Sequence, residues 1–323
     1  MNLTIKIINT VRLHINFIYF LLLLLFSSCK KESTQDSSLN NEFANGDPLI
    51  QVNISTNGVQ ILDEPKIDAK MTISFKDEEL HSENIAIEIR GKSSQMFPKK
   101  QYGFETRDQE NEDMDVSLLD MPEEEDWILQ APYSDKSLIR NVLIYDLSRE
   151  IGRYASRVKF VELTLNDVND GVYVFMEKLK RDKNRIDINK LKTSEISGED
   201  LTGGYIIKID KPDDQYTSLN SFVSEHSPYD PSGNNSIKFL YDTPDEEGIT
   251  PEQKEYISNY VKDFENTLAG ENFTDPIQGY DSHIDTDDFI DFFLLNELGN
   301  NVDGFRISTW IVKDKNEKMR MGP

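Results

Sequence analysis

The chain has 323 residues, of which 35 are Lys or Arg and 59 are Asp or Glu, so its net charge is 35 − 59 = −24. At roughly 150 residues per domain, this length allows one large domain or two ordinary ones. Hydrophobic residues make up 37% and aromatic residues 10% of the chain. That is enough for a packed core and excludes a disordered acidic tail. A pI near 4.5 argues against nucleic-acid binding, because affinity for phosphates comes from clustered Lys and Arg.

The cysteine and histidine content limits the kinds of metal site. The chain has one cysteine, which excludes a disulfide framework and a cysteine-based zinc site. Its four histidines lie far apart in the sequence, which argues against a histidine–zinc hydrolase. Any bound metal is therefore expected to have carboxylate ligands, which favours Mg, Mn or Ca.

The N-terminus has the pattern of an export signal. Lys6 and Arg12 form a basic region, and residues 17–26 are an unbroken apolar run. Ten helical residues cover only about half of a ~30 Å hydrocarbon core, so this run is too short to span a membrane. It matches the apolar part of a secretory signal.

The only cysteine, Cys29, follows two serines directly after that run. This arrangement resembles a bacterial lipobox, and the alternative is a free cysteine that happens to follow an apolar stretch. We expect residues 1–28 to be a lipoprotein signal peptide and residues 29–47 a flexible polar tether. Acylated Cys29 would anchor the exported protein to a lipid bilayer, at the outer membrane or cell surface of a Gram-negative-type bacterium.

Alternation of apolar and polar residues predicts strands in the first part of the exported chain. These strands span residues 49–54, 71–75, 84–89 and 101–105. They predict a β-meander.

A helix is predicted next, over residues 136–150, with Gly152 just past its end. Two strands, 159–165 and 171–176, follow it, with a turn predicted at Asn169-Asp170-Gly171. One more strand is predicted at 203–210.

Residues 211–235 are polar and are predicted to be a long surface insertion. The C-terminal third is predicted to be helical. Thr250-Pro251-Glu252-Gln253 has the sequence of a capping box that opens a helix, and a second helix is predicted at 287–298, ending at Gly299. Strands followed by helices predict an α+β fold, with one domain over residues 48–323.

Three polar clusters could carry chemistry, and each also has an ordinary structural explanation. Residues 90–100 combine a Gly/Ser loop with basic residues, which suits a phosphate but also a plain hairpin connection. Residues 177–185 contain five basic residues and could form a solvated loop. Residues 296–304 combine carboxylates and amides, which suit Mg but are also common in turns.

Together, these clusters resemble the CotH-type atypical protein kinases, named for a spore-coat protein kinase. The matching motifs occur in the family's order across residues 49–323. They are Ile89-Arg90-Gly91-Lys92-Ser93-Ser94 with Phe97-Pro98-Lys99-Lys100, Asp126-Trp127-Ile128-Leu129 with Asp135-Lys136-Ser137-Leu138-Ile139-Arg140-Asn141, Gly171-Val172-Tyr173 with Glu177-Lys178 and Lys180-Arg181-Asp182, Gly203-Gly204-Tyr205, and Asn301-Val302-Asp303-Gly304-Phe305-Arg306.

The resemblance implies a distant protein-kinase-like fold, β-rich in its N-terminal part and helical in its C-terminal part, that binds ATP with Mg or Mn. It also implies roles for individual residues. The turn containing Arg90, Ser93 and Ser94 would be the equivalent of the glycine loop, and Lys99 or Lys100, on the following strand, would reach the phosphates. The helix at 136–150 would take the place of helix αC, and Glu177 and Lys178 would lie where a hinge meets the adenine. Asp303 would be the catalytic aspartate and a metal ligand, and Asn301 would be a second metal ligand.

In the family, the Gly-Pro pair matched by Gly322-Pro323 precedes a metal-binding aspartate. We therefore expect the domain to be incomplete at its C-terminus. The leading hypothesis is phosphoryl transfer from ATP to Ser or Thr of cell-envelope proteins. The alternative is a non-catalytic, lipid-anchored surface binding or adhesion module on the same fold. A glycosidase ranks last, because no pair of acids stands out.

Overall fold

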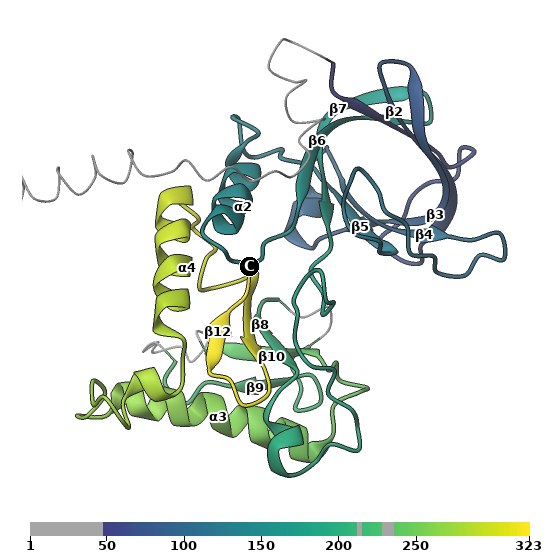
Figure 1. Cartoon of the computed structure of the whole chain (residues 1–323). Helices are drawn as coiled ribbons and strands as arrows, with labels where there is room; N and C mark the ends of the chain where they lie inside the picture. Colours follow the sequence, from purple (N-terminus) through teal and green to yellow (C-terminus); the bar gives the residue numbers. More distant parts are fainter. Residues whose placement is uncertain (1–47, 212–214, 228–235) are drawn as a thin grey trace, which may run out of the picture. The chain divides into compact units, whose positions relative to one another are not determined.

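The computed structural model describes residues 48–211, 215–227 and 236–323 (Figure 1). The chain divides into two units, residues 1–48 and residues 49–323, and the description below concerns the second. The predicted signal peptide, the predicted tether and Cys29 lie outside the described residues. Of the helices in these ranges, none is long and apolar enough to cross a bilayer.

The first half of the unit is a closed β-barrel, seen at the upper right of Figure 1. Its strands are β1 (Ile50–Ser55), β2 (Ile67–Phe75), β3 (Glu78–Arg90), β4 (Gln101–Arg107), β5 (Asp126–Gln130), β6 (Val158–Leu165) and β7 (Val168–Glu177). Strands β1 to β4 form the predicted meander, which is confirmed, and β5 continues it. A parallel pairing of β1 with β6 closes the barrel in the order β1-β2-β3-β4-β5-β7-β6, and this closure was not predicted.

Alternating side chains fill the barrel interior. Strand β4 is buried at every second residue, the pattern of a sheet with one face inside. Phe104 of β4 packs edge-on against Phe175 of β7, with ring centroids 5.6 Å apart, and Trp127 of β5 lies 5.5 Å from the same ring. These fully buried aromatic side chains form the centre of the barrel core.

The hairpin between β6 and β7 turns three residues earlier than predicted. Leu165 pairs with Val168, so the two-residue turn is Asn166-Asp167, and both residues have positive φ (48° and 63°). Positive φ at both central residues is typical of a type I′ turn, which suits the twist of a hairpin. The turn predicted at Asn169-Asp170-Gly171 is therefore wrong, because these residues lie within β7, where the register shifts.

Helix α2 (Arg140–Glu150) is shorter than predicted, because residues 136–139 form a turn before it. The Asp135 carboxylate accepts hydrogen bonds from the backbone N–H groups of Ser137 (3.0 Å) and Arg140 (2.9 Å), which holds this turn. As predicted, Gly152 lies just past the end of the helix, with a φ of +89°. The N–H of Gly152 donates to Arg149 and that of Arg153 to Ser148, which together make a Schellman motif.

Helix α2 packs on the outer face of the barrel. Its Val142 and Tyr145 contact a cluster formed by Ile128 of β5, β6 and β7. Of its other apolar residues, Leu143 is exposed, whereas Ile144 and Leu147 are half-buried. The helix therefore attaches to the barrel by one stripe of side chains.

The rest of the unit is a five-stranded sheet with two helices, seen below the barrel in Figure 1. The elements are β8 (Tyr205–Ile209), β9 (Ser221–Val223), β10 (Lys238–Thr243), α3 (Pro251–Ala269), α4 (Thr286–Gly299), β11 (Thr309–Lys313) and β12 (Met319–Met321). The strand order is β12-β11-β8-β10-β9. The C-terminal third contains the predicted helices but is not all helical, because β11 pairs with β8 and β12 pairs with β11. The predicted polar insertion contains β9.

The two predicted helices of this region are confirmed. Thr250 caps α3 with the complete capping box, in which its side chain accepts from Gln253 N–H and the Gln253 side chain accepts from Thr250 N–H. Helix α4 ends at Gly299, and Asn300 takes the left-handed conformation that closes it. The fold is thus mixed α/β with a β-rich N-terminal part, and a protein-kinase-like fold stays a prediction.

Candidate functional site

The first predicted cluster is a tight turn at the end of β3. Arg90 is the last residue of the strand, and Gly91 follows with φ +87°. A Cβ at Gly91 would lie 2.2 Å from Ser94 Oγ, and its positive φ disfavours other residues, so this turn favours glycine. Ser93 and Ser94 then open a short 3₁₀ turn, Ser93–Met96.

Arg90 connects the barrel with α2 and with the end of β8. Its guanidinium interacts electrostatically with Tyr145 of α2, Glu88 of β3 and Asp210, the residue after β8. Burial lowers the pKa of Arg90, and these three partners oppose that effect. The turn also meets the same end of β8 through Lys211, whose Nζ donates to Ser93 Oγ at 2.7 Å.

The third predicted cluster is the turn after α4. Asn301 donates from its side chain to Asn296 Oδ1 (2.8 Å) and accepts at Oδ1 from the N–H of Asp303 (3.2 Å). One carboxylate oxygen of Asp303 binds Arg306 at 2.6 Å, and the Asp303 side chain is 48% exposed. The turn is therefore held to the end of α4 by amide side chains, with the carboxylate facing solvent.

Two elements connect these clusters. In α2, Tyr145 interacts with Arg90, while its neighbour Ile144 contacts the end of α4, where a Cβ at Gly299 would lie 3.1 Å from Ile144 Cγ1. In the sheet, Thr309 of β11 pairs with Ile209, the residue before Asp210. The Arg90 turn and the segment that carries Asp303 thus both adjoin α2 and the end of β8. We define this region as the α2–β8 site.

A buried amide lies in the same part of the barrel face. The strand registers place Gln130 of β5 in the cross-strand row that begins at Arg90 and passes through Gln101 to Val174. Gln130 Oε1 is buried and has no hydrogen-bond partner among the described residues. A buried acceptor without a donor is costly, so this oxygen suits a ligand that brings an N–H or O–H group.

Lys99 and Lys100 precede β4 and do not lie on it, which corrects their predicted place. Lys99 Nζ donates to the carbonyl oxygens of Asp170 and Val172, both at 2.8 Å, and lies 4.3 Å from the centre of the Tyr173 ring. Lys100 Nζ donates to the carbonyls of Gln95 and Phe97. Both ammonium groups are therefore bound to backbone at the barrel rim.

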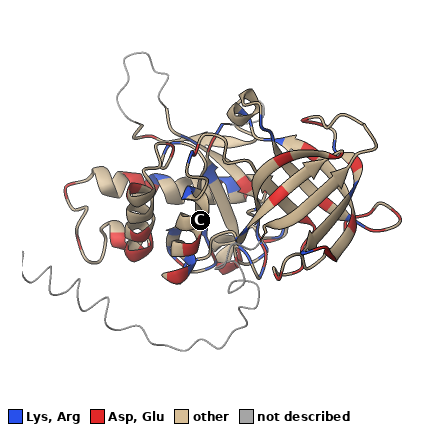
Figure 2. Ribbon diagram, turned by 90° about the horizontal axis from the view of Figure 1, so that it is seen from above, with Lys and Arg blue, Asp and Glu red and all other residues tan. Residues whose placement is uncertain are grey.

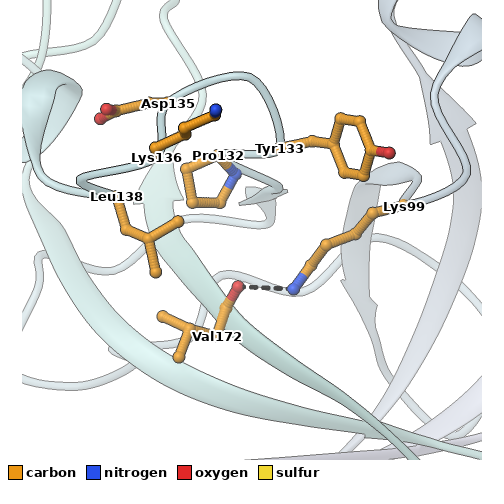
Figure 3. A pocket seen from close by; sticks show the side chains of 7 residues that line it. All are labelled: Lys99, Pro132, Tyr133, Asp135, Lys136, Leu138 and Val172. Carbon is orange, nitrogen blue, oxygen red and sulfur yellow. Dashed lines mark hydrogen bonds between the residues drawn. The ribbon is translucent and has the colours of Figure 1, made fainter.

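Lys99 also lines a pocket of about 240 Å³ at this rim (Figure 3). In Figure 3 the Lys99 side chain points to the Val172 carbonyl. The Tyr133 ring lies above the Lys99 side chain in this view. The pocket is lined by Lys99, Pro132, Tyr133, Asp135, Lys136, Leu138 and Val172. It contains neither Arg90 nor Asp303, so the predicted phosphate-binding lysines and the α2–β8 site have different surroundings.

Glu177 is fully buried in an ionic cluster at the opposite end of the barrel. Its carboxylate accepts from Arg157 Nη1 (2.7 Å), from the Arg157 N–H (2.8 Å) and from the Tyr154 hydroxyl (3.3 Å). Arg185 Nε lies 3.9 Å away, and the Arg185 side chain is 2% exposed. Each carboxylate oxygen of Glu177 thus has a protein partner, which is the pattern of a structural residue.

Three of the five basic residues after β7, namely Lys178, Lys180 and Arg185, form ion pairs, which corrects the explanation of a solvated loop for this part of the segment. Lys178 binds Asp126 at 2.8 Å with its side chain half exposed. Lys180 binds Glu124, Glu125 and Asp126 at 2.7–2.9 Å. Burial lowers the pKa of Lys180, but hydrogen bonds to these three carboxylates outweigh it and raise the pKa overall.

Among the described residues, one set of three carboxylates lies close enough together to hold a metal ion. It consists of Asp115, Glu124 and Glu125. The ammonium of Lys180 already binds two of its members, so a cation is present there. Hydrogen bonding to Glu124, partly opposed by burial, lowers the pKa of Glu125 well below its ordinary value. The group forms part of the ionic cluster that attaches residues 178–185 to the barrel.

Sequence reasoning missed several residues that build these sites, namely Glu88, Gln130, Tyr145, Arg157 and Asp210. Asp210 could have been noticed as a carboxylate at the end of a predicted strand. The others stand within predicted or observed elements, and no local pattern singles them out. Figure 2 shows many of the Lys and Arg segments in the middle of the view, between the barrel and the helices, and acidic segments spread over both.

The family model of the CotH kinase protein family matches residues 87–323 of the chain. The chain belongs to the CotH kinase protein family. The matched region begins in β3, three residues before Arg90, and includes every described residue of the predicted site. No curated protein sequence matches the chain.

Membership of the CotH kinase family implies ATP and, with it, a divalent metal. The side chains of the α2–β8 site suit the phosphates of ATP and a divalent metal. Arg90 supplies positive charge for phosphates, and Gln130 Oε1 offers an unused buried acceptor. Asp303 keeps one carboxylate oxygen outside its ion pair with Arg306, and the amide oxygen of Asn301 lies in the same turn. One or two such oxygens, completed by water and phosphates, are a usual magnesium environment.

Proposed function

We propose that this CotH-family chain transfers a phosphoryl group from ATP to Ser or Thr of cell-envelope proteins, with Mg or Mn as the metal. Family membership over most of the described unit supports a kinase-like phosphotransfer role. The finer proposal rests on the α2–β8 site, where the Arg90 turn and the Asp303 segment adjoin the same helix and strand. Phosphoryl transfer requires positioning and charge neutralisation more than covalent chemistry.

The residues of this site divide into two roles. Arg90 and the N–H groups of the Gly91 turn would hold phosphate oxygens. Asp303 would accept the proton of the acceptor hydroxyl and orient it for attack, and Asn301 would offer an oxygen to the metal. The metal, when bound, supplies neutralisation of the developing phosphate charge. Lys99, Lys100 and Glu177 receive no catalytic role, because their polar groups are bound to other parts of the protein.

The export signal and lipobox pattern support the location. We propose that the protein is anchored to a bilayer through acylated Cys29 and acts on envelope proteins from there. Mass spectrometry of membrane fractions tests this, because it would detect a diacylated Cys29 peptide and no peptide from residues 1–28. Recovery of an unmodified Cys29 peptide with an intact N-terminus would contradict it.

Asp303→Asn tests the catalytic proposal. We expect transfer from labelled ATP to fall by roughly 10²-fold or more, the usual contribution of a positioned proton acceptor. Stability should change by less than about 1 kcal/mol, because the ion pair with Arg306 is exposed. Asp200→Asn is the matched control, since Asp200 forms a similar exposed pair with Lys315. Undiminished transfer in Asp303→Asn would contradict the assignment.

A non-catalytic, lipid-anchored binding module on the same fold is a second proposal. It is favoured by the large apolar side chains that α4 exposes, such as Leu294 and Leu298. This function predicts that Mg-ATP and Mn-ATP leave the melting temperature unchanged while a protein or glycan ligand raises it. Stabilisation by nucleotide would favour the kinase.

A further inference from the structure

Helix α4 is apolar around most of its circumference but is buried on one side only. On the inner side, Phe292 is buried in the sheet core and packs against Phe305, and Phe289 packs against Phe264 of α3. On the outer side, Ile290 is 49%, Leu294 56% and Leu298 67% exposed. A helix that is hydrophobic all round is normally covered on all sides, so this outer side has the character of a contact surface.

The three outer residues form one stripe, because they are spaced four apart in the helix. Val302, in the turn after the helix, is also exposed (77%). Single exposed apolar side chains are ordinary, whereas a contiguous apolar patch of large side chains marks an interaction site. We call Ile290, Leu294 and Leu298 the α4 stripe.

Carboxylates border the α4 stripe on both sides. At about 100° per residue, Asp291 lies about 60° to one side of Leu294 and Glu297 about 60° to the other. Asp287 lies beside Ile290, at the N-terminal end of the stripe. In the part of the chain that the structure describes, the carboxylates of Asp287, Asp291 and Glu297 make no hydrogen bond or ion pair. Helix α4 itself contains no Lys or Arg.

We propose that the α4 stripe binds a basic amphipathic helix of a partner protein. The apolar face of such a helix would cover Ile290, Leu294 and Leu298, and Lys or Arg beside that face would pair with the flanking carboxylates. The two helices would pack along their apolar stripes, with complementary charge fixing the orientation. The proposal does not depend on phosphoryl transfer.

Charge argues against the two other occupants. A second copy would place its own flanking carboxylates against the same carboxylates, in a chain whose net charge is −24. An anionic lipid surface would be repelled by the same three groups. A basic helix gains both apolar contact and ion pairing, so it is the occupant that the surface fits.

The test uses the full chain and a labelled 18-residue peptide in which Leu recurs every three or four positions and Lys fills the rest. A second peptide of the same composition, with Leu spread around the helix, controls for bulk charge. We expect the amphipathic peptide to bind at least tenfold more tightly than the spread peptide in fluorescence anisotropy. Binding should weaken about tenfold between 50 mM and 500 mM NaCl, because the flanking ion pairs are exposed.

Two variants and two matched controls locate the binding. Leu298→Asp and Glu297→Lys should each weaken the amphipathic peptide about tenfold. Ile277→Asp, at a side chain 79% exposed on another loop, and Glu255→Lys, at an exposed residue of α3, should leave binding unchanged. All four positions are exposed, so thermal unfolding should remain near that of the wild type. If Leu298→Asp lowers the melting temperature, only peptide binding by Glu297→Lys is used to judge the proposal.

Equal binding of both peptides, or wild-type binding by Glu297→Lys, would overturn the proposal. So would a concentration-dependent dimer in light scattering that Leu298→Asp abolishes, since a second copy would then be the occupant. Flotation of the wild-type chain, but not of Leu298→Asp, with phosphatidylcholine vesicles would assign the stripe to lipid and would equally overturn it.

Discussion

Glu177 offers a sharp test of the account, because sequence resemblance placed it at a nucleotide hinge and the structure places it in a buried ionic cluster. Glu177→Gln keeps the size of the side chain and removes its charge. The carboxylate is 0% exposed and has three hydrogen bonds, two of them from Arg157. Removing one partner of a buried ion pair costs roughly 3–5 kcal/mol, because the opposite charge is left uncompensated.

The expected cost lies at the lower end of that range, for reasons visible in the cluster. The Arg157 side chain is 37% exposed and can be hydrated. Arg185 is 2% exposed, but it also donates to the carbonyls of Lys178 and Asp126 and lies 3.8 Å from Glu124. We therefore expect Glu177→Gln to lower the free energy of unfolding by about 3 kcal/mol, measured by urea denaturation monitored through tryptophan fluorescence.

Lys178→Gln is the matched control, because Lys178 belongs to the same motif and its ion pair with Asp126 is half exposed. Exposed pairs contribute about 0–1 kcal/mol, so this variant should be nearly neutral. The reasoning would be refuted if Glu177→Gln changed the stability by less than about 1 kcal/mol while weakening nucleotide binding. That result would restore the hinge role.

Two further predictions concern stability. Lys313 is 2% exposed, and burial lowers its pKa to about 8 from an ordinary value of 10.5. Between these values the unfolded chain holds the proton and the folded chain does not, so the stability of the wild type should rise by about 2 kcal/mol from pH 8 to pH 10. Lys313→Met should lack this rise in urea titrations at the two pH values, and an equal rise in both proteins would contradict the burial argument. Gly91→Ala should destabilise by about 1–2 kcal/mol through its positive φ and its contact with Ser94, and by more than Gly58→Ala, where φ is also positive but the space is open. Equal melting temperatures for the two variants would show that Ser94 moves aside freely.

Local patterns predicted the elements whose determinants are local. The strands of the meander follow from alternation, and the start of α3 follows from the four residues of its capping box. The prediction of the hairpin turn was wrong because the sequence contains two Asn-Asp pairs, at 166–167 and 169–170, and both consist of residues that favour turns. The register of β6 against β7 selects the first pair, and this register depends on which side chains face the barrel interior.

Long-range strand pairings could not be predicted from the sequence, for a physical reason. Closure of the barrel joins β1 to β6, more than a hundred residues apart, and leaves no local signature. The α2–β8 site shows the same difference between local features, which the sequence indicates, and long-range interactions, which it does not. The sequence indicated the Arg90 and Asp303 clusters, but the electrostatic interactions of Arg90 with Tyr145 and Asp210 depend on how α2 and β8 pack. Lys99 and Lys100 resembled phosphate ligands in the sequence, whereas in the fold nearby backbone carbonyls bind them.

The central claim is that nucleotide phosphates bind at the α2–β8 site. The most direct measurement is calorimetric titration of the wild type, Arg90→Gln and Lys99→Gln with ATP in the presence of Mn. The account predicts at least tenfold weaker binding for Arg90→Gln and near-wild-type binding for Lys99→Gln, whose ammonium is bound to the Asp170 and Val172 carbonyls. Wild-type affinity in Arg90→Gln, with loss of binding in Lys99→Gln, would contradict it and would place the nucleotide at the pocket on the barrel rim.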